Sequence, residues 1–195
     1  DVYKRQVYVD LNGDRKIDAN DMSYDYGFTD DPEYMIGLNL GFSWKNWEVN
    51  TQWTGAWNVS RMISDVFRQP FVSSAGSNAG GLLSYHLDHT WTPENPSQSA
   101  EYPRATQVNA SNNYATSTLF EKDAKYLRLK TLQVAYNFQF PLMKKLGLTT
   151  CQLAFSGYNL LTFSPYLWGD PEATASNAPT YPLTKTYTLS LKLGF

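Results

Sequence analysis

The sequence predicts an all-β protein, a fragment of an antiparallel transmembrane β-barrel that supplies about five C-terminal strands of a larger wall. Aromatic residues make up 15% of the chain and charged residues only 17%, a mixture that favours pleated strands over helices. Apolar and polar residues alternate in several segments, as in strands with two different faces. The links between these segments alternate short and long, which is typical of outer-membrane barrels.

The first two predicted strands cover residues 34–44 and 47–57. In the first strand the large apolar residues share one face, and they are Tyr34, Ile36, Leu38, Leu40, Phe42 and Trp44. Only Lys45 and Asn46 separate the strands, so the pair is expected to form a β-hairpin. Each strand has about the length that a tilted strand needs to cross a bilayer.

Three further strands are predicted at residues 126–140, 150–161 and 187–195, with a bulge expected at Gly157. Short connections are expected in the periplasm, whereas residues 58–125 and 163–186 are expected to form long extracellular loops. The same parity places residues 1–33 outside the cell and the C-terminus in the periplasm. Five strands cannot close a barrel, so the rest of the wall is expected upstream of residue 1.

Composition argues against several other functions. The net charge of −2 gives no basic patch for nucleic acid, and the single cysteine, Cys151, excludes an internal disulfide. No Ser-His-Asp or Cys-His arrangement can be argued, so no enzymatic activity is expected. Four loop carboxylates could serve glycoside hydrolysis, but nothing in the sequence fixes their separation. They are Glu94, Glu101, Asp170 and Glu172.

An acidic segment near the N-terminus has the spacing of a calcium loop. Its six residues fall at the first, third, fifth, seventh, ninth and twelfth positions of an EF-hand-like loop, and they are Asp10, Asn12, Asp14, Lys16, Asp18 and Asp21. Arg15 stands where such loops have glycine. The segment could bind Ca²⁺, with no other cofactor expected, or it could be a solvated turn rich in Asx residues.

Two other loop features have two interpretations each. His86, Asp88 and His89 could hold a transition metal, or they could lie in a solvated loop. Four loop aromatics could stack on a substrate or contact a covering protein, or they could pack inside the loops. These aromatics are Trp91, Tyr102, Tyr166 and Trp168.

Several segments, in the same order, resemble the TonB-dependent receptors of the SusC/RagA type. They are Asp10-Leu11-Asn12-Gly13-Asp14 followed by Ile17-Asp18 and Asp21, Trp91-Thr92-Pro93-Glu94-Asn95-Pro96 followed by Tyr102-Pro103-Arg104, Tyr126-Leu127-Arg128-Leu129-Lys130, Gly157-Tyr158-Asn159-Leu160-Leu161-Thr162-Phe163 followed by Gly169-Asp170-Pro171-Glu172, and the stretch from Tyr181-Pro182 to Phe195. The resemblance implies a barrel of about 22 strands with an N-terminal plug. It also implies import of oligosaccharides or peptides across the bacterial outer membrane, with a SusD-like surface lipoprotein and the TonB complex as partners.

The last predicted strand resembles the sorting signal that the outer-membrane insertion machinery reads. The signal residues would be Tyr187, Leu189, Leu191, Leu193 and Phe195. The alternative to a transporter is a secreted carbohydrate-binding β-sandwich with a dockerin-like calcium loop. A sandwich would explain the acidic segment and the aromatics, but it would not explain the short and long links.

Overall fold

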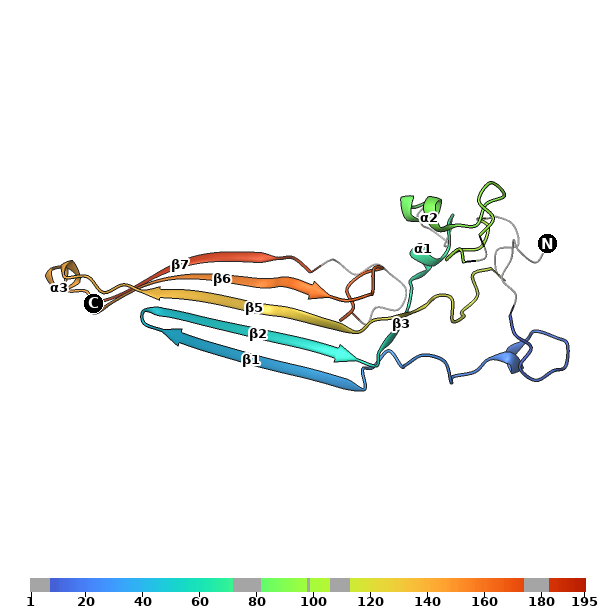
Figure 1. The fold of residues 1–195 in the computed structure, drawn as a ribbon, viewed down its shortest axis with the longest axis horizontal. Helices are drawn as coiled ribbons and strands as arrows, with labels where there is room; N and C mark the ends of the chain where they lie inside the picture. Colours follow the sequence, from blue (N-terminus) through green and yellow to red (C-terminus); the bar gives the residue numbers. More distant parts are fainter. Residues whose placement is uncertain (1–7, 72–81, 98, 106–112, 174–182) are drawn as a thin grey trace, which may run out of the picture. The chain divides into compact units, whose positions relative to one another are not determined.

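The computed structural model describes residues 8–71, 82–97, 99–105, 113–173 and 183–195. Its main feature is a five-stranded antiparallel sheet with strand order β1-β2-β5-β6-β7 (Figure 1). The strands are β1 (Tyr34–Trp44), β2 (Trp47–Trp57), β5 (Tyr126–Asn137), β6 (Thr150–Phe163) and β7 (Thr186–Gly194). The predicted fold class, an antiparallel barrel fragment, is confirmed, and the sheet is open, with β1 and β7 as its edges.

The chain divides into two compact units. The sheet unit consists of residues 31–59, 124–172 and 181–195, and the loop unit of residues 1–30, 60–123 and 173–180. The loop unit therefore takes in most of the predicted loop 58–125 as well as the N-terminal segment. Residues 1–7, parts of both predicted long loops, and the Tyr181-Pro182 pair of the resemblance lie outside the described residues.

β1 and β2 form the predicted hairpin. Trp44 pairs with Trp47, and the register continues without a break to Tyr34 opposite Trp57. The link is as short as predicted, and Lys45 within it has a positive φ of 54°. Because partners in this register point to the same side, the apolar residues of both strands share one face.

A bulge interrupts the pairing of β5 with β6. The register passes from Leu129 opposite Leu161 to Thr131 opposite Tyr158, so Lys130 on β5 faces two residues, Asn159 and Leu160, on β6. Asn159 has a φ of 53°. The bulge thus lies just after the predicted position, Gly157. Gly157 is covered by a neighbouring side chain instead, since a Cβ there would lie 2.7 Å from Leu160 Cδ2.

The remaining strand ends differ slightly from the prediction. β5 ends at Asn137 rather than at residue 140, and the short helix α3 (Leu142–Lys145) follows. One further bond, from Phe138 N to Cys151 O at 2.8 Å, continues the pairing beyond the strand. β6 extends two residues further than predicted, to Phe163. Proline at position 141 has no N–H to donate, which limits further pairing of β5.

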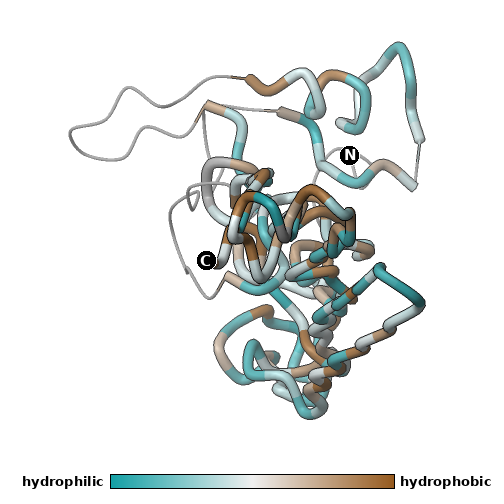
Figure 2. Tube along the Cα trace, turned by 90° about the vertical axis from the view of Figure 1, so that its left-hand side faces the viewer, coloured by the Kyte–Doolittle hydropathy of each residue, from teal (hydrophilic) through white to brown (hydrophobic). Residues whose placement is uncertain are grey.

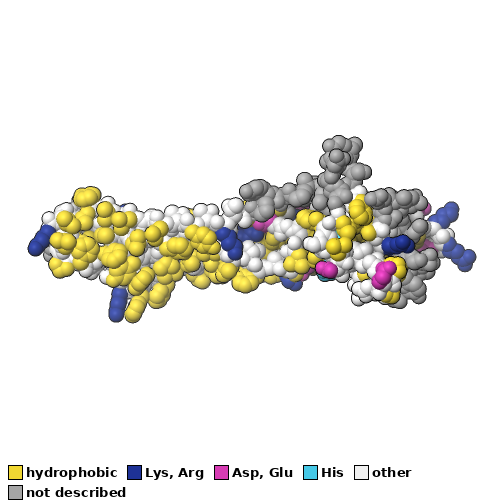
Figure 3. All heavy atoms as spheres, turned by 90° about the horizontal axis from the view of Figure 1, so that it is seen from above, with side chains coloured by type: hydrophobic (Ala, Val, Ile, Leu, Met, Phe, Trp, Pro, Cys, Tyr) yellow, Lys and Arg dark blue, Asp and Glu magenta, His cyan; other side chains and the backbone are white. Residues whose placement is uncertain are grey.

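The sheet has an apolar face and a polar face. The apolar face carries Ile36, Leu38, Leu40, Phe42, Val49, Trp53, Leu132, Val134, Tyr136, Leu153, Phe155, Leu189, Leu191 and Leu193. Many of these side chains are exposed, Leu189 by 71% and Phe42 by 64%. Figure 3 shows hydrophobic side chains gathered along one side of the sheet, and Figure 2 shows hydrophobic and hydrophilic residues alternating along the chain. An exposed apolar surface of this kind marks an interaction with lipid or protein.

The loop unit has a small core of its own. It contains the 3₁₀ turn η1 (Ala19–Asp21), the strands β3 (Ser60–Met62) and β4 (Glu121–Asp123), which pair antiparallel, and the helices α1 (Asp65–Arg68) and α2 (Ser84–His89). Its buried side chains include Ile63, His86, Tyr102, Tyr114 and Phe120. Among the described residues, no helix has both the length and the apolar character that crossing a membrane requires.

Candidate functional site

The polar face of the sheet carries side chains that bond to one another across strands. Asn137 Nδ2 donates to Glu48 Oε1 at 2.7 Å, and Gln152 Nε2 donates to Asn137 Oδ1 at 2.9 Å. These three residues belong to β5, β2 and β6, so the bonds link three neighbouring strands. Side chains with amide and carboxylate groups suit a face that meets water rather than lipid.

A charged cluster lies near the other end of the same face, centred on Arg128 of β5. Arg128 pairs in register with Thr162 of β6, and its Nε donates to Thr162 Oγ1 at 3.0 Å. Nη1 donates to Glu172 Oε2 at 2.6 Å and Nη2 to Asp170 Oδ1 at 2.7 Å. The Arg128 side chain is only 2% exposed, and its charge is compensated by two carboxylates.

Two more side chains complete the cluster. Lys130 Nζ lies 2.9 Å from Glu172 Oε2, and the Arg128 guanidinium lies 5.6 Å from the centre of the Tyr126 ring. The backbone N–H of Glu172 donates to Asp170 Oδ1 at 2.9 Å, which shapes the loop that carries both acids. Two cations thus meet two carboxylates. Removing one partner of such a buried group typically costs about 3–5 kcal/mol, because it leaves an uncompensated charge.

The cluster joins two segments that lie about 40 residues apart in the sequence. One is Tyr126 to Lys130 at the start of β5, and the other is Gly169 to Glu172, which holds two of the four carboxylates considered for hydrolysis. Their meeting also bears on the hydrolysis hypothesis. Asp170 and Glu172 are ion-paired with Arg128, which does not leave them as a general acid and base on either side of a sugar. The pairing of β5 with β6 brings these residues together, and the sequence contains no signal for that pairing.

The predicted loop aromatics fall into two groups. Trp91 and Tyr102 are 7% and 2% exposed and belong to the core of the loop unit, where the Tyr102 ring meets His86 edge to face at 4.8 Å. Packing within the loop is therefore the better interpretation for these two. Tyr166 and Trp168 are half-buried in the sheet unit, and their rings meet edge to face at 5.8 Å.

The two histidines of α2 are held by backbone groups. His86 Nε2 lies 2.8 Å from Phe67 O, and its Nδ1 accepts from Leu83 N at 3.3 Å. His89 Nδ1 lies 2.8 Å from Tyr85 O. The rings of His89 and Tyr85 stack with their centroids 3.8 Å apart. Within the described ranges, no group of three or more His, Cys, Asp or Glu residues is placed to hold a metal ion. The transition-metal hypothesis thus gains no support.

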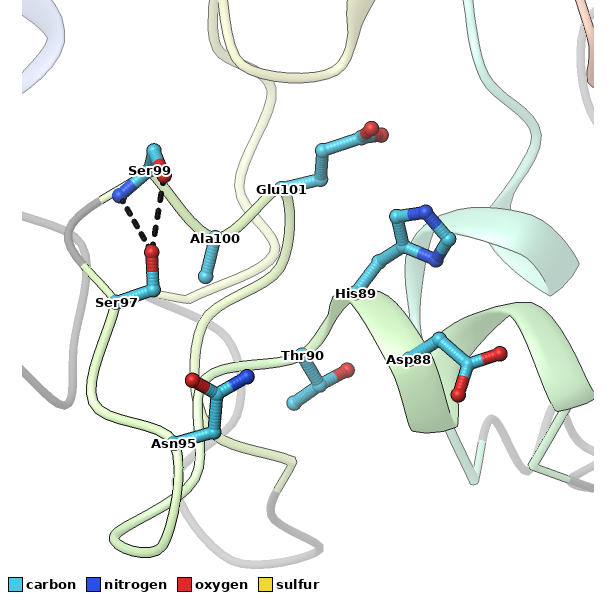
Figure 4. Close-up of a pocket in the computed structure, with 8 residues that line it drawn as sticks. All are labelled: Asp88, His89, Thr90, Asn95, Ser97, Ser99, Ala100 and Glu101. Carbon is cyan, nitrogen blue, oxygen red and sulfur yellow. Dashed lines mark hydrogen bonds between the residues drawn. The ribbon is translucent and has the colours of Figure 1, made fainter.

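A polar pocket of about 180 Å³ lies beside α2 in the loop unit. Figure 4 shows its lining, which consists of Asp88, His89, Thr90, Asn95, Ser97, Ser99, Ala100 and Glu101. Tyr85 Oη bonds to both oxygens of Glu101, at 3.2 and 3.1 Å. Burial raises the pKa of Tyr85, and the nearby charge of Glu101 raises it further. Glu101 is thus hydrogen-bonded to Tyr85, and Asp88 is the other acid of the lining.

The acidic segment folds around its own side chains. Asp10 accepts bonds from Gly13 N at 2.6 Å and Arg15 N at 2.7 Å, and Arg15 adopts a φ of 68°. Asp21 accepts from Leu11 N and Asp18 N. Asn12, Asp14 and Asp18 each accept from the backbone N–H two residues later, so Lys16 contributes its N–H to Asp14. Calcium binding stays a prediction from the sequence.

The residues of the predicted sorting signal lie at one edge of the sheet. Tyr187, Leu189, Leu191 and Leu193 alternate along β7 on the apolar face. Phe195 follows the strand and is 86% exposed. Recognition of these residues by insertion machinery stays a prediction.

An open antiparallel sheet with one exposed apolar face, one polar face and a tight hairpin is the wall of a transmembrane β-barrel. Over 97% of its length the chain is 26% identical to TonB-dependent receptor P3 of Formosa agariphila, and over 96% it is 29% identical to TonB-dependent receptor P26 of the same organism. The chain spans 19% of the length of each. The resemblance to TonB-dependent receptors is confirmed.

Solved structures share this fold. The RagAB peptide transporter matches with a TM-score of 0.70 and 24% identity, covering 92% of this chain and 19% of that one. The RagAB peptide importer in its "closed-closed" state matches with a TM-score of 0.67 and 22% identity, covering 93% of this chain and 20% of that one. No protein-family model matches the chain.

Proposed function

We propose that this chain forms part of the wall of a TonB-dependent transporter in the bacterial outer membrane. The observation that carries the proposal is the division into an apolar and a polar face, which continues through all five strands. With the apolar face toward lipid, the polar face lines a water-filled interior. A β-sandwich would need a second sheet over the apolar face, yet that face is exposed in the described part of the chain.

The connections suggest the orientation. The hairpin turn at Lys45 and Asn46 and the α3 segment join strands at one end of the sheet. The long segments 58–125 and 164–185 leave from the other end. Short turns face the periplasm in outer-membrane barrels and long loops face outward. The Arg128 cluster then lies toward the outer end and the Glu48–Asn137 pair toward the periplasm.

The whole protein would import peptides or oligosaccharides with a SusD-like surface lipoprotein, driven by the TonB complex and placed in the membrane by the insertion machinery. Two observations support this part: both curated relatives are named as TonB-dependent receptors, and the solved structures are of a peptide transporter. Purification of the tagged full-length protein from native membranes tests the partner. A surface lipoprotein in stoichiometric amount is expected, and a receptor purified without one would overturn this part.

The direction of the two faces can be tested with neighbouring cysteines. In full-length protein carrying Cys151→Ala, Asn39→Cys lies on the polar face and Leu40→Cys on the apolar face. A membrane-impermeant maleimide should label Asn39→Cys in detergent-free membranes and leave Leu40→Cys unlabelled, while a lipid-soluble maleimide labels Leu40→Cys. The opposite result, or equal labelling of both positions, would refute the proposed wall.

A further inference from the structure

We propose that Arg128 is a positioning residue that fixes residues 164–172 as a strap on the polar face, so that the strap presents Leu167 and Trp168 to solutes in the interior. The inference rests on the proposed function, because the polar face must line the interior. It adds a specificity-determining element to that function. The contacts that support it all lie within the sheet unit.

The strap is attached at two places. Toward its beginning, Tyr166 packs against a small buried cluster formed by Ala56, Val59 and Ala124. At its end, Asp170 and Glu172 bind the Arg128 guanidinium. Two attachments on either side of a short stretch hold that stretch in place. The residues between them are Leu167, Trp168 and Gly169.

Arg128 is suited to the second attachment. Three of its nitrogens each donate to a different side chain, Thr162 on the sheet and the two strap acids. A lysine has one nitrogen and could not reproduce this fork. Burial of the guanidinium strengthens each bond. Lys130, the residue at the bulge, is a second cation that bonds to Glu172.

The residues between the attachments are the ones a solute would meet. Leu167 is 72% exposed although it is apolar, and Trp168 is held edge to face against Tyr166. Arg128, and therefore the strap, lies on the face opposite to Leu127 and Leu129, which point to the apolar side. A solute that covers this leucine and this indole removes apolar surface from water, which favours binding.

The first experiment measures whether Arg128 fixes the strap. Full-length protein with Cys151→Ala and Leu167→Cys is spin-labelled at the cysteine and studied by electron paramagnetic resonance. The label should be ordered in this background and mobile when Arg128→Met, Asp170→Asn and Glu172→Gln are combined. The triple change removes the charge of Arg128 together with both carboxylates, and the cation that remains, Lys130, is 31% exposed and can be solvated. Equal ordering in both proteins would overturn the proposal.

The second experiment measures the effect on transport. Uptake of a fluorescein-labelled oligopeptide and of a labelled oligosaccharide is compared at equal outer-membrane levels of each variant. The triple variant and Trp168→Ala should each raise KM several-fold, and their combination should add little, because both act through the strap. Glu48→Gln, on the same face at the other end, is the matched control. An unchanged KM for both solutes with a mobile strap would refute the specificity role, whereas failure of the face-labelling test would refute the proposed wall itself.

Discussion

The side-chain amide of Asn137 donates a hydrogen bond to the carboxylate of Glu48 across 89 positions of sequence, at 2.7 Å. The same amide accepts from Gln152 through its oxygen, so one asparagine joins three strands. Glu48 and Asn137 are only partly buried. The bonds therefore act in a wet environment, where each contributes modestly to stability and more to the alignment of the strands.

Replacement of Asn137, which makes both of these hydrogen bonds, tests their contribution to stability. Asn137→Ala removes two side-chain hydrogen bonds and should lower the free energy of unfolding by about 1–2 kcal/mol. The measurement is urea unfolding of the full-length protein in lipid vesicles. Asn39→Ala is the control on the same face, because no side-chain bond of Asn39 is found among the described residues. Equal losses for both variants would show that the bonds do not matter.

A charge on the apolar face should prevent stable insertion. Leu38 lies near the middle of β1 opposite Trp53, and Leu38→Arg should cost about 2–4 kcal/mol if this position is near the bilayer centre. Asn50→Arg, on the polar face of β2, should cost much less. Folding yield into vesicles, read from the shift of the unheated band in gel electrophoresis, measures both. Similar yields for the two variants would contradict the assignment of the faces.

The backbone at the bulge should reject β-branched residues. Asn159 has a φ of 53°, a region that asparagine and glycine tolerate and valine does not. Asn159→Val should therefore destabilise the protein by about 1–3 kcal/mol. Asn159→Gly loses the weak bond to Thr184 O at 3.3 Å but relieves the backbone, so its midpoint of unfolding in urea should stay close to that of the unaltered protein. A valine variant as stable as the glycine variant would disprove this explanation.

His86 should hold α1 and α2 of the loop unit together. It is 1% exposed, and His86→Phe would leave Leu83 N and Phe67 O without their partner, at a cost of about 1–3 kcal/mol for each buried group. Faster amide hydrogen exchange in α1 and α2 is expected, with exchange in β1 and β2 unchanged. Leu87→Ser, an exposed change one residue away, serves as the control. Unchanged exchange in His86→Phe would rule out this role.

The acidic segment should loosen in acid. The backbone N–H of Asp18, followed by that of Leu11, holds the pKa of Asp21 below its ordinary value. A carboxyl with a lowered pKa stabilises the fold above its ordinary pKa, and this contribution is lost as the pH falls through the lowered one. Chemical shifts of the Leu11 and Asp18 amides should follow that titration and stay flat in Asp21→Asn.

The same amides test the calcium prediction. If millimolar Ca²⁺ causes no change in their chemical shifts and no calorimetric heat, the calcium prediction is refuted.

The sequence predicted β1 and β2 at their observed bounds because both signals there are local. Alternation defines each strand and two residues define the turn. β5 was harder, since its alternation changes phase at Lys130 and its end at Asn137 depends on the helix that follows. The Arg128 cluster depends on which residue of β5 lies opposite Thr162, and the single-strand pattern does not contain that information.

The aromatic residues show the same limit. Trp91 and Tyr102 have loop-like neighbours in the sequence, so exposure to a ligand and burial in a loop core were both open. Tyr102 is buried because α2 and the segment before β4 fold against it, contacts that span many residues. The share of aromatics favoured strands over helices, but the environment of each ring follows from tertiary packing.

The bulge at Lys130 shifts the alternation of β5 by one residue. Before it, odd-numbered Leu127 and Leu129 point to the apolar side, and after it even-numbered Leu132 and Val134 do so. Lys130 has no partner on β2, since Thr131 pairs with Gln52 and Leu129 with Trp53, so its removal would leave Arg128 on the polar side and both leucines on the apolar side. A residue added to or removed from a regularly paired part of β5 would instead turn the strand beyond that point to the other face. Single-residue changes in the length of β5 should therefore be tolerated at Lys130 and not in the regularly paired parts of the strand.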